Sequence, residues 1–268
     1  MASQYIVRHG AMRFLGEFQA EVPYARGAAV VVRTDRGHEL GEVLCEATPR
    51  AVELLAEPTR GQIVRLVTET DRQRQESLRA GETRALEVCR RFVAQRQLPM
   101  ELVDVEHLFG GERIIFYFLA EKRVDFRELV KDLAREFQTR IEMRQIGVRD
   151  EAKLLADYGD CGKPVCCNTH MSVMPPVTMR MAKLQKSTLD PSKISGRCGR
   201  LKCCLRFEHE VYEEFQRSLP PSGSRILTAK GKGKVLAQEI LARRLLVEFE
   251  DGRRVVIAAD EVLTRLGS

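Results

Sequence analysis

The chain has 268 residues, of which 44% are apolar and 31% charged, and its formal net charge is +6. This composition excludes a disordered protein and indicates a globular one with about two domains. No apolar run approaches the ~20 residues that cross a bilayer, and the N-terminus lacks the apolar core of a secretory signal. We therefore expect a cytoplasmic protein without membrane insertion.

The first half of the chain predicts an α+β fold. Residues 1–60 show strand-like runs separated by turn residues and are expected to form an N-terminal β segment. Residues 61–147 give a strand, a long polar helix, two strands, an amphipathic helix and a last strand. This β-α-β-β-α-β order predicts a ferredoxin-like core.

The second half contains the sequence Pro-Pro-Ser-Gly at residues 220–223, a composition that predicts a linker. Residues 148–219 have weak periodicity and hold six cysteines, which predicts a cysteine-rich metal-binding segment. Residues 224–268 contain short apolar runs broken by glycines, a pattern that predicts a small C-terminal β-barrel.

Six of the eight cysteines lie in two matching segments. Each segment reads C-G-[K/R]-x-x-C-C, and equivalent cysteines are 37 positions apart. Clustered cysteines in a cytosolic protein indicate metal or redox chemistry rather than structural disulfides. The candidate metal ligands are Cys161, Cys166, Cys167, Cys198, Cys203 and Cys204. The other two, Cys45 and Cys89, stand alone and are predicted to be small core residues.

The spacing within each segment limits how a metal is held. Adjacent cysteines point in different directions, so the simplest arrangement takes two ligands from each segment to form one four-cysteine site. The remaining two would pack, bridge or bind a second centre. Zinc knuckles usually have C-x₂₋₄-C spacing, whereas C-x₄-C is closer to an iron–sulfur pattern. The residues alone leave iron–sulfur and zinc open.

A basic stretch surrounds the second cysteine segment. Between Met179 and Arg206 there are eight basic residues and one acidic residue. Three interpretations are open: contact with RNA phosphates, contact with an acidic protein, or a solvated surface that also offsets the charge of metal-bound thiolates. The candidate contact residues are Lys183, Lys186, Lys193, Arg197, Arg200 and Lys202. Only 6% of residues are aromatic and there is no Trp, which disfavours a base-stacking surface.

Longer blocks of sequence resemble a known family. The two cysteine segments, CGKPVCC and CGRLKCC, with the intervening PPVTMRMAKLQKSTLDPSKISGR, resemble the polymerase-suppressor-protein C-terminal domain family in its bacterial branch. The upstream run RIIFYFLAEKRVDFRELVKDLAREFQTRIEMRQIGVRDEAKLL and the N-terminal RGHELGEV are similar to the same proteins. The resemblance covers about residues 5–215.

The resemblance implies a cytoplasmic, non-enzymatic regulator that carries [4Fe–4S] clusters, with the six candidate cysteines at the positions of the family's ligands. It also implies assembly with two small helical partner proteins and action with ribonuclease Y in messenger RNA processing, with effects on sporulation, competence and biofilm formation. A zinc-stabilised nucleic-acid-binding module is the alternative. No paired carboxylate or serine motif in the sequence indicates a catalytic site.

Overall fold

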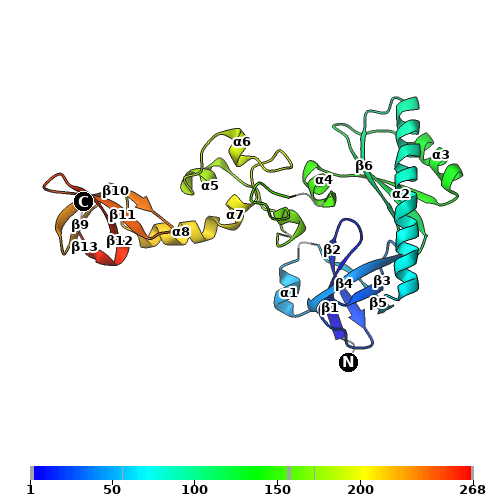
Figure 1. Cartoon of the computed structure of the whole chain (residues 1–268), viewed down its shortest axis with the longest axis horizontal. Helices are drawn as coiled ribbons and strands as arrows, with labels where there is room; N and C mark the ends of the chain where they lie inside the picture. Colours follow the sequence, from blue (N-terminus) through cyan, green and yellow to red (C-terminus); the bar gives the residue numbers. More distant parts are fainter. Residues whose placement is uncertain (1–2, 56, 156–157, 172, 267–268) are drawn as a thin grey trace. The chain divides into compact units, whose positions relative to one another are not determined.

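The computed structural model describes residues 3–55, 57–155, 158–171 and 173–266, which form two compact units. The first unit comprises the described residues up to Met174 together with Arg197–Arg200. The second comprises Pro175–Gly196 and the described residues from Leu201 onward. Figure 1 labels the elements of both units. In the part of the chain that the structure describes, no helix is long and apolar enough to span a bilayer.

The first unit begins with a closed five-stranded barrel (Figure 1). Its strands are β1 (Ser3–His9), β2 (Phe14–Ala20), β3 (Ala29–Arg33), β4 (His38–Glu46) and β5 (Thr59–Leu66), in the order β1-β2-β5-β3-β4. Alternating side chains such as Tyr5, Val7 and Phe18 fill its interior. Helix α1 (Pro49–Glu53) lies between β4 and β5 and begins at Thr48, whose hydroxyl accepts a hydrogen bond from the Ala51 amide.

The ferredoxin-like prediction differs from the structure in its first strand. Strand β5 pairs in parallel with β2 and antiparallel with β3, so it closes the barrel instead of joining the following strands. Its buried side chain, Ile63, packs in the barrel interior. The next sheet therefore has three strands: β6 (Glu101–His107), β7 (Arg113–Leu119) and β8 (Arg140–Gln145). The class is α+β, as predicted, but the four-stranded ferredoxin-like pairing is not formed.

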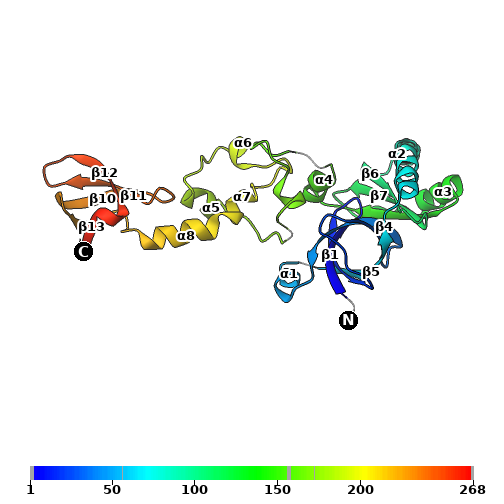
Figure 2. The same ribbon diagram turned by 60° about the horizontal axis from the view of Figure 1, so that its bottom comes forward.

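Helices α2 (Glu69–Gln95) and α3 (Arg127–Phe137) pack on one face of this sheet (Figure 2). Strand β7 alternates: Phe116 and Phe118 face the helices, whereas Ile115 and Tyr117 pack on the opposite side. A reciprocal capping box between Thr68 and the residue at the third helical position begins α2. The sheet therefore has two buried faces, which explains the unbroken apolar run of β7.

The two lone cysteines have different surroundings. Cys89 on α2 is fully buried among the helix and sheet side chains, and burial raises the pKa of its thiol to about 12. Cys45 on β4 is exposed, so the prediction of a core position is confirmed for Cys89 and wrong for Cys45. Strict alternation from the buried Val43 would turn Cys45 inward, but the pairing of β4 with β1 shifts register here, with Val43 opposite Val7 and Cys45 opposite Ile6, so the alternation is broken before Cys45.

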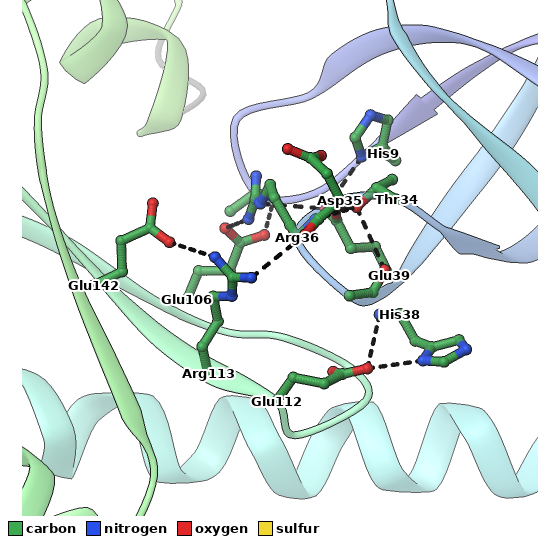
Figure 3. A network of polar contacts seen from close by, with 12 residues as sticks. His9, Thr34, Asp35, Arg36, His38, Glu39, Glu106, Glu112, Arg113 and Glu142 are labelled. Atoms are coloured by element: carbon green, nitrogen blue, oxygen red, sulfur yellow. Dashed lines mark hydrogen bonds and ion pairs between the residues drawn. The ribbon is translucent and has the colours of Figure 1, made fainter.

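A buried polar network joins the barrel to the three-stranded sheet. Arg36, in the turn between β3 and β4, forms ion pairs with Glu39 of β4 and Glu106 of β6 (Figure 3). The three side chains are only 9%, 2% and 9% exposed. Burial alone would lower the pKa of Arg36, but the charges of Glu106 and Glu39 outweigh it, so the pKa is raised.

Both carboxylates have further donors. Glu39 Oε2 lies 3.1 Å from His9 Nδ1 and Glu39 Oε1 accepts a 2.7 Å bond from the Thr34 hydroxyl. Glu106 accepts bonds from the Tyr117 hydroxyl at 2.6 Å and the Ala11 amide at 2.7 Å. His9, Thr34 and Ala11 belong to the barrel segment, whereas Tyr117 belongs to the sheet. The network therefore fixes the position of the barrel against the sheet.

The remaining elements surround the cysteines and form the C-terminal sheet. The first unit also holds α4 (Val148–Leu154) and the 3₁₀ turn η1 (Cys166–Asn168). The second unit holds α5 (Met179–Leu184), α6 (Pro191–Ile194), α7 (Cys204–Phe207) and α8 (His209–Ser218). Its strands are β9 (Arg225–Thr228), β10 (Gly231–Glu239), β11 (Arg244–Phe249), β12 (Arg254–Ala258) and β13 (Val262–Leu266), with η2 (Ala259–Glu261) before the last.

Residues 224–266 form the predicted β structure as an antiparallel sheet in the order β12-β11-β10-β9-β13. Ile226, Val235, Leu245 and Val247 form its buried core, together with other apolar side chains. Within the described residues, the edge strands β12 and β13 do not pair with each other, so the strand pairing expected of a closed barrel is incomplete.

Candidate metal-binding cysteine loops

The two cysteine segments fold in the same way, which makes the sequence repeat a structural one. We call residues 158–170 the first cysteine loop and residues 195–207 the second cysteine loop. An isolated antiparallel bridge lies at the base of each loop, and the bridged residues are again 37 positions apart: Tyr158 with Pro164, and Ser195 with Leu201. The bridge turns the chain back on itself around the first cysteine of each loop.

The glycine that follows the first cysteine has the same backbone conformation in both loops. The φ angle is +74° at Gly162 and +71° at Gly199. Side chains with a Cβ are strained in this left-handed region, so glycine permits the tight turn. At both positions a Cβ would meet no atom within 4 Å, so backbone conformation rather than crowding is the reason for glycine.

Each loop ends in one helical turn that begins beside its cysteine pair. The amide of Asn168 donates to the Val165 carbonyl at 2.9 Å, and the amide of Leu205 donates to the Lys202 carbonyl at 3.1 Å. The Cys166 carbonyl accepts from the amides of Thr169 and His170, as the Cys203 carbonyl accepts from those of Arg206 and Phe207. These backbone bonds hold equivalent cysteines in equivalent local settings.

The six sulfurs differ in exposure. Cys161 is exposed and the other five are half-buried, and none of the chain's eight cysteines forms a disulfide. Burial raises the pKa of the Cys204 thiol, and the neighbouring Cys203 and Glu208 add to this effect. Across the described ranges, no group of three or more His, Cys, Asp or Glu side chains converges in a geometry that holds a metal. The donor set nevertheless suits a soft metal, because thiolates are its preferred ligands.

Helix α4 and the residue before it contact both loops. The first loop packs on α4, where Cys167 lies close enough to Lys153 for their charges to interact. From the second loop, an Arg200 guanidinium nitrogen lies 3.9 Å from the point where a Cβ would stand at Gly147. Arg200 belongs to the first unit, so the tip of the second loop packs there with the sheet and α4.

The six basic residues predicted as a contact surface are divided between the two units. Arg197 and Arg200 belong to the first unit, and Lys183, Lys186, Lys193 and Lys202 to the second. Lys183 and Lys193 are exposed on α5 and α6. Lys186 donates its ammonium proton to the carbonyl oxygen of Gln238, which ties it to the C-terminal sheet. The basic residues of this stretch therefore have different local surroundings.

One cluster of charged residues escaped the sequence analysis. A pocket in the first unit is lined by four cations and by the end of the first cysteine loop: Arg8, Arg13, Arg144, Lys153, Cys167, Asn168 and Thr169. These residues come from β1, the turn after it, β8, α4 and η1. No local motif links them, and only the tertiary contacts between these elements bring them together.

Comparison with known proteins assigns the chain to a family. The family described as the PSP1 C-terminal conserved region matches residues 61–146, and the one described as PSP1-like protein, third domain, matches residues 176–219. The second match contains the whole second cysteine loop. No solved structure matches the chain. The chain belongs to the PSP1 family of proteins.

Two proteins are similar to this chain in sequence. The chain is 44% identical over 229 residues to the stage 0 sporulation protein YaaT of Bacillus subtilis (strain 168), an alignment that covers 85% of this chain and 83% of YaaT. It is also 48% identical over 62 residues to an uncharacterized protein of Schizosaccharomyces pombe, which covers 23% of this chain and 8% of that protein.

Proposed function

We propose that this protein is a non-enzymatic cytoplasmic regulatory adaptor whose two cysteine loops together hold an iron–sulfur cluster. The observation that carries the proposal is the repeated loop: bridge, left-handed glycine and helical turn recur at a constant offset around C-x₄-C-C. Duplicated loops that present thiols at equivalent positions suit a shared soft-metal centre. The similarity to YaaT supports a role in sporulation control.

Four of the six cysteines are the proposed principal ligands: Cys161, Cys166, Cys198 and Cys203. Cys167 lines the pocket that also contains Arg8, Arg13, Arg144 and Lys153, which we call the basic pocket. We therefore do not assign Cys167 as a ligand of the cluster that its neighbour Cys166 binds. Cys204 is the equivalent residue of the second loop. An iron–sulfur cluster takes four thiolates and would supply a centre sensitive to oxygen and redox state. The nearby cations Lys163, Arg197 and Lys202 would offset the negative charge of such a centre.

The loops have little apolar core of their own. Between residues 158 and 207, the described buried apolar side chains are Met171, Ala182, Ile194 and Leu205. Where a segment buries so few side chains, the energy of ligand binding is also folding energy. Loss of the cluster would therefore loosen the loops and release whatever docks on them.

The family resemblance suggests which molecules dock there. We propose that the loops join two small helical partner proteins, and that the complex acts with ribonuclease Y to modulate messenger RNA processing, sporulation, competence and biofilm formation. Direct contact between the basic residues and RNA is a separate alternative, in which zinc stabilises a nucleic-acid-binding module. A single metal measurement distinguishes the two.

The test begins with anaerobic purification of the full chain, followed by iron, sulfide and zinc analysis and an absorption spectrum. We expect brown protein with iron and sulfide. Zinc at about one per chain without iron would support the nucleic-acid-binding module instead, and filter binding of RNA across a salt series would then test that module.

Two variants with a matched control separate ligation from folding. Cys198→Ser should bleach the colour and abolish pull-down of the co-expressed helical partners, whereas Cys45→Ser, at an exposed cysteine outside the loops, should do neither. Cys167→Ser should keep most of the iron. Partner pull-down that survives in a colourless Cys198→Ser protein would contradict the proposed link between cluster and assembly.

A further inference from the structure

The basic pocket beside the first cysteine loop has the dimensions of a ligand site. Its volume is about 390 Å³, within the usual range for small-molecule sites. Its lining combines four apolar residues, Phe14, Leu15, Leu44 and Leu55, with polar and cationic ones. All of these described lining residues belong to the first unit.

The charge of the pocket lining is strongly unbalanced. Arg8, Arg13, Arg144 and Lys153 face a single acidic lining residue, Glu57. Arg8 has a counter-charge outside the pocket, an ion pair with Glu42 at 2.6 Å. Among the described residues, no carboxylate lies at ion-pair distance from Arg13, Arg144 or Lys153. Such a group of cations attracts an anion of more than one charge.

One of these cations is held in place by an aromatic ring. The guanidinium of Arg144 lies over the ring of Phe14, 5.0 Å from the ring centroid. Arg13 is exposed, and its φ of +50° fixes the backbone of its turn rather than its guanidinium. A cation that is already held loses little entropy on binding, which favours affinity for a ligand that contacts Arg144.

A buried polar group without a partner also belongs to the pocket wall. Asn168 is only 6% exposed, and its Oδ1 atom has no hydrogen-bond partner within the described residues. Its amide can present either oxygen or nitrogen toward a ligand. Thr59 belongs to the same lining, and a threonine hydroxyl can donate to an oxyanion. A buried, unsatisfied amide is costly unless a ligand or water completes its bonding.

We propose that this pocket binds a small phosphate-bearing molecule, with the phosphate on Arg13, Arg144 and Lys153 and the organic part against apolar residues of the lining. Because Cys167, Asn168 and Thr169 form one wall, an occupied pocket would hold the end of the first cysteine loop in its folded turn. Binding of a phosphorylated metabolite would thus stabilise the folded loop. This binding does not require the cysteines to hold a metal.

Calorimetry on the full chain tests the proposal with adenosine monophosphate, inorganic phosphate and adenosine as probes. Adenosine monophosphate should bind and adenosine should not. Tight binding of inorganic phosphate would identify the free anion as the ligand, and weaker binding would show that the organic part contributes. Failure of both phosphate probes, or equal binding of adenosine, would overturn the proposal.

A variant pair locates the site. Arg144→Gln should weaken phosphate binding by about tenfold or more, since it removes a charge-assisted donor. Arg140→Gln is the matched control, because Arg140 is an exposed residue of the same strand outside the pocket lining, and it should leave affinity unchanged. Equal affinity in the two variants would refute the assignment of this pocket.

A measurement on the wild-type protein gives a test that does not depend on whether a variant folds. Saturating adenosine monophosphate should slow alkylation of Cys167 several-fold, as followed by peptide mass spectrometry, because this sulfur borders the pocket. Alkylation of Cys45, which is exposed on the barrel, should keep its rate. Unchanged labelling of Cys167 under conditions where calorimetry shows binding would place the ligand elsewhere and reject this site.

Discussion

Replacement of Arg36 by Met should destabilise the first unit strongly. The change keeps a long apolar stem but removes the cation that faces Glu39 and Glu106, which are 2% and 9% exposed. Loss of one partner from a buried ion pair typically costs about 3–5 kcal/mol, because an uncompensated charge remains. His9 and Thr34 still contact Glu39, and Tyr117 still donates to Glu106, so we expect a value near 3 kcal/mol.

The assay is urea unfolding of the full chain, followed by far-ultraviolet circular dichroism. A double-mutant cycle with Glu106→Gln measures the pair itself: once Glu106 is neutral, loss of Arg36 should cost less, with a coupling energy of about 1–3 kcal/mol. The single oxygen of glutamine can still accept the bond from the Ala11 amide, and its NH2 group can donate to the oxygen of the Tyr117 hydroxyl. The coupling should appear in the unfolding transition of the first unit.

The control is the exposed ion pair between Arg127 and Asp125 at the start of α3, with an N···O distance of 2.6 Å. Arg127→Met should change stability by no more than about 0.5 kcal/mol, since solvent screens exposed pairs. A cost below about 1 kcal/mol for Arg36→Met, or strictly additive effects with Glu106→Gln, would refute the conclusion that this network couples the barrel to the sheet.

Three further predictions concern acid stability, the core and the loop glycines. Burial would raise the pKa of Glu39, but the hydrogen bond from His9 and the charges of His9 and Arg36 lower it overall, so its stabilisation is present above about pH 4.3 and is lost as pH falls through the lowered folded-state pKa. Glu39→Gln should therefore flatten the dependence of urea midpoints on pH between neutral and acid, and an unchanged slope would contradict this. Phe116→Ala should cost about 3–5 kcal/mol in urea unfolding, because Phe116 is fully buried between the sheet and its helices, and a loss under 1 kcal/mol would argue against that packing. Gly162→Ala and Gly199→Ala should each add about 1–2 kcal/mol of backbone strain and reduce bound metal per chain, whereas Gly27→Ala, at a φ of +82° in the barrel, should carry similar strain and leave metal content unchanged. Metal analysis of the three glycine variants checks the last expectation, and equal metal loss in all three would show that the loop glycines have no special role.

The barrel junction and the cysteine loops are stabilised by different interactions. The first unit is stabilised by the two packed faces of β7 and by the buried network, and its Gly147 lies beside Arg200 at the tip of the second loop. The loops contribute few buried side chains and depend on their local hydrogen bonds and on what their thiols bind. A change at Arg36 should thus alter stability before metal content, and a change at Cys198 the reverse.

Local patterns in the sequence determined much of this protein. The strand-like runs of β6 to β8, the amphipathic pattern of α3 and the repeat at an offset of 37 are all properties of short segments, since side-chain period and backbone preference act over a few residues. The repeat indicated a duplicated element, and the structure shows that both copies have a glycine in the left-handed region. The α+β class followed from the same patterns.

Only the tertiary structure decided which strands pair and which distant charged residues come together. Strand β5 reads as a strand by itself, but whether it joins the barrel or the next sheet depends on which edges lie within reach, and here β2 and β3 accept it. Arg36 meets Glu106 across 70 residues, and Arg13, Arg144 and Lys153 meet across more than one hundred. Such groupings lower the free energy only once the chain is folded, so no sequence periodicity records them.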